Sequence, residues 1–136
     1  MGFSAQIDEF IAGSEDLLLA VVQDASQEMI IAAENPTTKG GNMRVDTGFL
    51  RNSLVASIGT MPSGESVNPG EQMPEWDATA VLAVIQEMQL GDTIYFGWTA
   101  NYAEARESKD FFMRNATQRW QEFVTDSGNK LKAALK

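Results

Sequence analysis

The 136-residue sequence contains neither cysteine nor histidine. Without cysteine, the chain has no disulfide framework, no thiolate nucleophile, and no thiolate ligand for zinc or an iron–sulfur cluster. Without histidine, it has no imidazole base, no Ser-His-Asp triad and no imidazole metal ligand. Only carboxylate, lysine, tyrosine, serine, threonine or hard-cation chemistry is left to such a chain.

Basic residues are also scarce. Ten Lys and Arg residues stand against nineteen Asp and Glu, which gives a formal net charge of -9. Open binding to nucleic acid or to an anionic membrane needs a basic surface, so this balance disfavours both. No apolar run approaches the roughly 18–20 residues that span a bilayer, and residues 1–6 do not open a secretion signal. We therefore expect a protein that is made in the cytoplasm and has no membrane partner.

The hydrophobic pattern predicts one α+β domain over residues 1–136. Hydrophobic residues make up 43% of the chain, which is enough for a core. Apolar residues recur at three- and four-residue steps over 4–34 and predict a long N-terminal helix that ends at Asn35-Pro36. Short β-branched and aromatic runs at 54–60 and 93–98 predict a small antiparallel sheet, with a short helix between them. A long C-terminal helix is expected after a polar connection at 99–108, with Ser108 as its N-cap and Asp110 in its first turn.

Charge is spread unevenly over these expected elements. The N-terminal helix carries seven acidic residues and no basic one, whereas seven basic and four acidic residues follow from Arg106 onward. This asymmetry would suit packing of the two long helices side by side, within one subunit or between neighbours. The segment 61–77 is punctuated by proline and glycine, is acidic, and exceeds the roughly 12–15 residues usual for loops in compact domains. It is either a disordered surface loop or a loop that faces a partner or a lumen.

No arrangement of residues supports catalysis. Glu104 and Glu107 lie three residues apart and could share a helix face, but nothing near them in the sequence completes an acid–base or metal site. Asp46 is better explained as the N-cap of a helical turn over 47–53, a role that Thr47 could also fill. Gly40-Gly41 does not fit a phosphate-binding spacing. We expect no enzymatic activity, no cofactor and no metal site.

Two stretches resemble one family. Arg44-Val45-Asp46-Thr47-Gly48-Phe49-Leu50-Arg51-Asn52-Ser53 is similar to the R-x-DTG-x-LR-x-S segment of the tail-completion (neck) proteins of long-tailed bacteriophages. The second stretch, Gly91 to Gly97 followed by Asn101-Tyr102-Ala103 and Glu107, is similar to the G-D-T-I-Y strand and Y-A-x-x-(L)-E turn of that family. The second stretch departs from the pattern where Arg106 replaces an apolar residue and Ser108-Lys109 replaces a glycine.

The resemblance implies a structural protein of the virion, located in the tail neck. It implies a homo-oligomeric ring, most simply a hexamer, that joins the tail terminator and tail tube to the head-completion or adaptor proteins below the portal. DNA would pass through only as cargo. The residues that it places at a subunit or partner interface are Asp46, Thr47, Gly48, Leu50, Arg51, Tyr102 and Glu107. Arg51 could pair with a carboxylate across that interface, or remain solvated beside a turn that is only cap and core.

Three alternatives remain open. A tail terminator or a head-side adaptor shares the size and the ring-forming habit of a tail-completion protein. An acidic DNA-mimic inhibitor would explain the net charge of -9, although it would need neither the DTG-x-LR-x-S turn nor a basic last helix. A carboxylate hydrolase is the most distant alternative.

Overall fold

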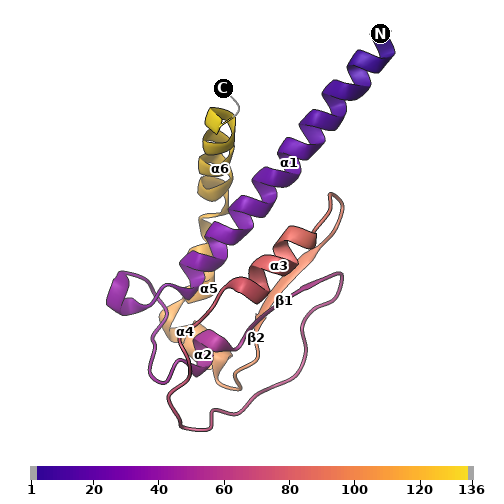
Figure 1. The fold of residues 1–136 in the computed structure, drawn as a ribbon. Helices are drawn as coiled ribbons and strands as arrows, with labels where there is room; N and C mark the ends of the chain where they lie inside the picture. The colour runs from indigo at the N-terminus through magenta and orange to yellow at the C-terminus, as the bar shows by residue number, and fades with distance from the viewer. Residues whose placement is uncertain (1–2, 135–136) are drawn as a thin grey trace.

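A computed structural model describes the backbone of residues 3–134 and the side chains of residues 15–134. A long N-terminal helix lies beside a two-stranded sheet and beside a bent run of C-terminal helices (Figure 1). The predicted α+β class is confirmed. The elements are α1 (Phe3–Glu34), the 3-10 turn η1 (Thr37–Lys39), α2 (Phe49–Asn52), β1 (Leu54–Ile58), α3 (Thr79–Glu87), β2 (Ile94–Trp98), α4 (Ala103–Asp110), α5 (Phe112–Gln118) and α6 (Trp120–Ala134).

Helix α1 packs against three other helices, α3, α5 and α6. It ends at Glu34, as the sequence predicts, because Pro36 disfavours a helical conformation at the residue before it. Its N-terminal part extends beyond the end of α6 in Figure 1. The predicted apolar positions of α1 that lie outside the described side chains are Ile7, Phe10 and Ile11.

The sheet consists of β1 and β2 in antiparallel register. Leu54 pairs with Trp98 at one end and Ile58 pairs with Ile94 at the other. Both strands are one or two residues shorter than the sequence predicts, and β1 stops before Gly59, whose φ of 87° leaves the extended region. Two strands alone are marginally stable in water, so the sheet depends on the helices that pack on it.

Trp98 joins two hydrophobic clusters that flank it. One cluster has Met43, Phe49, Leu50, Ala100 and Phe112 as its buried members, and Phe112 meets the Trp98 ring edge-on at 5.0 Å between centroids. The other holds Ile30, Leu54, Val81 and Ile85 between α1, the sheet and α3. The first cluster fixes the segment 43–50 against α5, and this segment carries the DTG sequence.

The long segment 61–77 forms neither helix nor strand, apart from one bridge between Ser66 and Ala100. It crosses the lower part of the molecule and returns to the start of α3 (Figure 1). Thr79 begins α3 and Ala78 is its N-cap, while the Asp77 carboxylate, one residue earlier, accepts the Thr79 N–H at 2.9 Å and supports the first turn.

The region after β2 differs from the sequence-based expectation. Residues 103–110 form α4 in place of the expected polar connection, and Ser108 and Asp110 lie within α4 instead of at the start of the last helix. The break falls at Phe111, whose φ is 55°. The Glu107 carboxylate accepts the N–H groups of Met113 and Arg114 at 2.8 and 2.9 Å, so it caps a new helix, α5. A single long helix is thereby divided, and only α6 matches the expected C-terminal helix.

The acidic N-terminal helix and α6 pack against each other within one chain, and α6 itself carries two acidic and two basic residues. Lys130 on α6 donates to Asp24 on α1 at 2.9 Å, and Asp24 has its pKa lowered although its burial opposes this, because Lys130 and Ser127 stabilise the carboxylate. Of the two arrangements that the charge asymmetry allowed, the structure contains the intramolecular one. Among residues 3–134, no helix combines the length and the apolar character needed to cross a membrane.

Candidate interface pocket

The DTG sequence forms a tight turn that begins α2. Gly48 has φ 86°, a left-handed conformation that is costly for any residue with a Cβ atom. Its carbonyl accepts the Asn52 N–H at 2.9 Å, so Gly48 is the N-cap of α2. The expectation that Asp46 or Thr47 would be the N-cap is wrong. Thr47 lies one residue before the N-cap, and its Oγ1 accepts the Phe49 N–H at 3.3 Å. Asp46 is exposed.

The long segment 61–77 holds this turn from the other side. The Thr47 carbonyl accepts the Met73 N–H at 2.8 Å and the Gln72 side-chain amide at 3.1 Å. The Asn52 side-chain amide bridges the Gly48 carbonyl at 2.8 Å and the Pro74 carbonyl at 3.0 Å. At least this part of the segment is therefore an ordered support for the turn.

A pocket of about 490 Å³ opens between the turn and α4. Residues from both segments that carry the phage resemblance line it, although more than fifty residues separate them in the sequence. The lining consists of Arg44, Val45, Asp46, Thr47, Gly48, Phe49, Leu50, Arg51, Asn68, Tyr102 and Arg106. Six of the seven residues predicted for an interface are therefore brought together, all except Glu107.

Aromatic and apolar groups form the base of the pocket. Leu50 and Phe49 belong to the buried cluster, and the Tyr102 ring lies 6.3 Å from the Phe49 ring, tilted by 39°. Val45 is 39% exposed at the rim, so its apolar side chain is available for contact.

Three arginines surround this base, and they differ in how they are paired. Arg106 binds Asp110 through two guanidinium nitrogens, at 2.9 and 2.7 Å. Arg51 contacts Glu34 and Trp76 of the same chain. Arg44 is exposed and has no ion pair among residues 15–134. Arg44 is thus the cation that the pocket presents to solvent, and sequence reasoning did not list it, although it opens the DTG segment.

The contacts of Arg51 lie within the chain, so it is not the solvated side chain of one sequence-based alternative, and its pairing across an interface stays a prediction. Its Nε donates to the Glu34 backbone carbonyl at 3.0 Å, lies 3.9 Å from Glu34 Oε2, and its guanidinium stacks 5.1 Å from the Trp76 ring centroid. This contact ties α2 to the end of α1. Part of the guanidinium remains open, since the Arg51 side chain is 22% exposed.

Glu34 is a fully buried carboxyl behind the pocket. Burial raises the pKa of Glu34 to about 8. The Trp98 indole N–H, which donates to Oε1 at 2.6 Å, and the charge of Arg51 lower the pKa by a smaller amount. Its position at the C-terminus of α1 also disfavours a negative charge. The group therefore keeps a proton at neutral pH and leaves the charge of Arg51 uncompensated.

Glu107 lies outside the pocket and has the capping role described above. Glu104, which the sequence places beside Glu107 but assigns to no site, is exposed on the first turn of α4. Within residues 15–134, no three carboxylates are grouped so that they could hold a metal ion. Two pocket residues carried no usable sequence signal: Asn68 comes from the long segment, and Arg106 was noted only as a departure from the family pattern.

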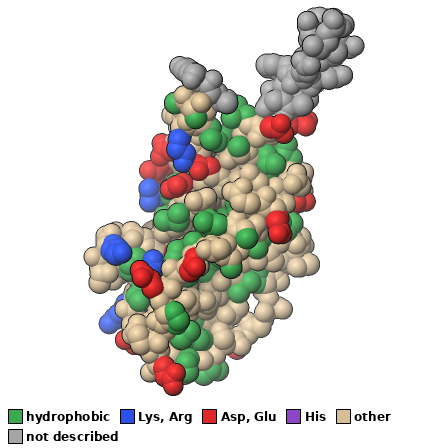
Figure 2. Space-filling model, in the orientation of Figure 1, with side chains coloured by type: hydrophobic (Ala, Val, Ile, Leu, Met, Phe, Trp, Pro, Cys, Tyr) green, Lys and Arg blue, Asp and Glu red, His purple; other side chains and the backbone are tan. Residues whose placement is uncertain are grey.

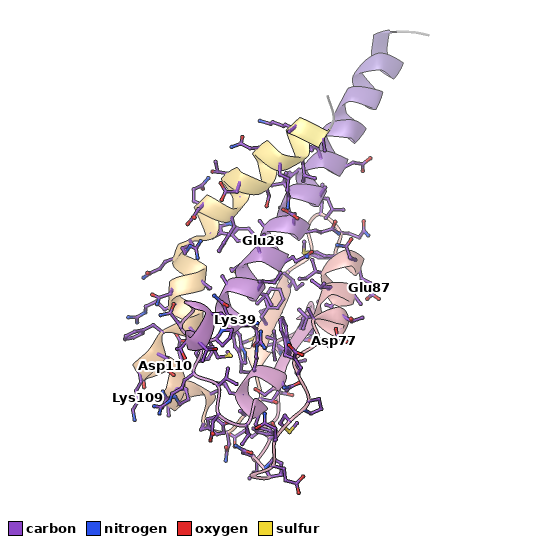
Figure 3. The ribbon with its side chains drawn as sticks, turned by 60° about the vertical axis from the view of Figure 1, so that its left-hand side comes forward. Glu28, Lys39, Asp77, Glu87, Lys109 and Asp110 are labelled. Carbon is purple, nitrogen blue, oxygen red and sulfur yellow. The ribbon has the colours of Figure 1, made fainter. Side chains whose placement is uncertain are left out.

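Basic residues are absent from the middle of the chain. Residues 52–105 contain seven acidic residues and no Lys or Arg, and they include the sheet, the long segment, α3 and the first turn of α4. In Figure 3, Asp77 and Glu87 lie on the side of α3, whereas Lys109 lies on the opposite side, next to Asp110. In Figure 2 the blue side chains lie along the left of the visible face, with red side chains among them, and red side chains also occur on the right.

Comparisons with protein-family models, with curated proteins and with solved structures found no match. The residues of the pocket and the two stretches around it are the basis for assigning a role.

Proposed function

We propose that this protein is a structural protein of the phage neck, and that it forms a ring, most simply of six copies. The ring joins the tail terminator and tube to the head-completion or portal-adaptor proteins. The observation that carries this proposal is the pocket, because residues from the two stretches that resemble tail-completion proteins meet there. Residues 44–51 supply one wall, and Tyr102 and Arg106 supply the other.

The chemistry of the pocket suits protein recognition better than catalysis. Arginine and tyrosine are the side chains that interfaces favour at their energetic centres, and the pocket presents both over an apolar base. The pocket has one carboxylate, Asp46, and neither a second carboxylate nor an imidazole lines it to activate the hydroxyl groups of Thr47 and Tyr102. We therefore assign no enzymatic activity and no cofactor to this protein.

The net charge of -9 is compatible with a DNA conduit. A wall that repels phosphate does not retain DNA, because binding to the phosphate backbone depends on neutralising cations. In a neck ring, DNA would pass as cargo and would not be a ligand. The location of the protein is then the tail neck of the virion, after synthesis in the host cytoplasm.

Co-purification tests this proposal directly. The tagged full chain is co-expressed with the proteins encoded by the genes beside its own. We expect it to capture a tail terminator or a head-completion protein. We expect Arg44→Glu to reduce capture about tenfold or more, as for a residue at the centre of an interface. Arg119→Glu is the matched control, because Arg119 is an exposed arginine outside the pocket that pairs locally with Glu122.

The identity of the captured protein separates the alternatives. Capture of the tail tube alone would indicate a tail terminator, and capture of the portal would indicate a head-side adaptor. Capture of a DNA-binding protein, released by competing DNA, would indicate a DNA mimic. Any of these results, or a failure to capture any virion protein, would contradict a tail-completion role.

A further inference from the structure

The two ends of the sheet present unlike surfaces. At the end where Leu54 pairs with Trp98, the chain leads into α2 and the arginine pocket. At the other end, where Ile58 pairs with Ile94, the turns that follow β1 and precede β2 lie together, and the Gly59 N–H donates to the Thr93 carbonyl at 2.8 Å. We call this second surface the acidic sheet end and define it by three residues: Glu87, Leu90 and Asp92.

The acidic sheet end combines negative charge with an exposed apolar side chain. Leu90 is 42% exposed. Glu87 and Asp92 are exposed and make no ion pair with any of residues 15–134. An exposed leucine between two unpaired carboxylates is a surface that a partner with an apolar base and a cation would bind.

The structure holds this end in a fixed shape. The Asp92 carboxylate accepts the Gln89 N–H at 2.9 Å, and the Asp92 N–H donates to the Gln89 carbonyl at 3.1 Å. The side-chain amide of Gln23 on α1 donates to the Met88 carbonyl at 3.2 Å. Because the turn is anchored at several points, little conformational entropy is lost when it binds.

The arginine pocket at the opposite end has the complementary features. Arg44 is exposed and without an ion pair among the described side chains, and Val45 lies at the rim above Phe49 and Tyr102. Five-residue strands separate the two ends by about 13–17 Å, so the surfaces cannot meet within one molecule. Figure 1 shows the turn between α3 and β2 at one end of the sheet and α2 with α4 at the other.

We propose that the acidic sheet end of one copy binds in the arginine pocket of the next copy. Leu90 would pack against Val45 and the aromatic base, and Glu87 or Asp92 would pair with Arg44. Contacts between unlike surfaces repeat from copy to copy and close into a ring when the rotation allows it. This inference rests on the proposed ring and identifies the two surfaces that would form its contacts.

Charge exchange between separate variants tests the contact. The Arg44→Glu variant has a defective pocket, and the Glu87→Lys/Asp92→Lys variant has a defective sheet end. For each variant alone, we expect association, measured by sedimentation at low salt, to be at least about tenfold weaker than for the wild type. An equal mixture should associate again, because the reversed pocket and reversed end attract each other and the two unaltered surfaces also match.

Net charge is controlled by Glu15→Lys/Asp16→Lys, an equal reversal at two exposed residues of α1 far from both ends. We expect this variant to associate like the wild type. Equal weakening by the control, or failure of the mixture to recover, would overturn the proposed contact. A wild-type chain that stays monomeric at its highest soluble concentration would overturn it as well.

Cysteine pairing gives a second test, because the natural chain has no cysteine. Val45→Cys/Leu90→Cys should form a ladder of disulfide-linked oligomers, whereas each single variant should remain unlinked. Efficient dimers of the Val45→Cys variant alone would show a symmetric contact and contradict the inference. Head-to-tail linkage without capture of any tail protein would leave this contact intact and remove the neck function, so the two proposals fail separately.

Discussion

At the scale of single residues, Glu34 controls how stability depends on pH. Its pKa is raised to about 8 by burial, above an ordinary value of 4.5. Between these two pH values the folded state binds more protons than the unfolded state, so stability falls as pH rises through this window and levels off above about 8. The total loss is several kcal/mol, at roughly 1.4 kcal/mol for each pKa unit.

Replacing Glu34 with glutamine should remove this dependence. The glutamine side chain would still accept the Trp98 indole N–H through its amide oxygen but could not ionise. We expect Glu34→Gln and the wild type to have similar free energies of unfolding near about pH 5, and the variant to be the more stable protein above about pH 8. Urea denaturation at both pH values measures this. Parallel pH profiles for the two proteins would show that the Glu34 carboxyl is not the cause.

The backbone conformation at residue 48 favours glycine. Replacing Gly48 tests whether the cost comes from the strained φ angle or from steric contact of the new Cβ atom. A Cβ atom at residue 48 would meet nothing closer than 3.5 Å, so only the φ of 86° opposes it. We expect Gly48→Ala to destabilise the chain by about 1–2 kcal/mol. Gly128→Ala lies in a helix with open space around the new Cβ atom and should stabilise by about 0.5–1 kcal/mol. Thermal unfolding should therefore show shifts of opposite sign.

At the scale of elements, the break between α4 and α5 depends on a carboxylate cap. Glu107 accepts two N–H groups at the start of α5. We expect Glu107→Ala to destabilise the protein by about 0.5–2 kcal/mol, as for loss of an N-terminal cap. Glu104→Ala, three residues earlier on the same helix, is the control and should change the free energy of unfolding by less than about 0.5 kcal/mol. Equal effects would exclude a special role for the cap.

The sequence predicts an element well where a hydrophobic pattern marks it. It predicts an element less well where a single side-chain contact or backbone conformation sets the boundary. The periodicity of α1 and its end at Pro36 are local, and both are confirmed, as are the two strands. No hydrophobic pattern marks the break at Phe111. It depends on one side chain, that of Glu107, which reaches forward past the break to Met113 and Arg114. Similarly, Thr47 satisfies an N–H group in the turn, but the conformation of Gly48 determines where α2 begins.

At the scale of the whole molecule, the fold converts separated sequence segments into surfaces. The grouping of Asp46, Thr47, Gly48, Leu50, Arg51 and Tyr102 was predictable from the resemblance, and the pocket brings these residues together. The engagement of Arg51 by Glu34 was not predictable, since no local pattern relates α1 to α2.

Charge-dependent assembly should be sensitive to salt. Exposed ion pairs are screened over a Debye length of about 10 Å at 0.1 M ionic strength and about 3 Å at 1 M. We expect association between copies to weaken as salt rises, with a smaller salt dependence in Arg44→Glu than in the wild type. Sedimentation over a salt series measures this, and an unchanged slope in the variant would exclude Arg44 as the cation of the contact.

The most direct test of the neck assignment is the position of this chain in assembled particles. Particles released from cells that carry the gene can be labelled with gold-conjugated antibody against the chain and viewed by electron microscopy. We expect the label at the junction between head and tail. Label along the tail tube, label at the distal tip, or particles that bind no antibody would contradict a role in the neck.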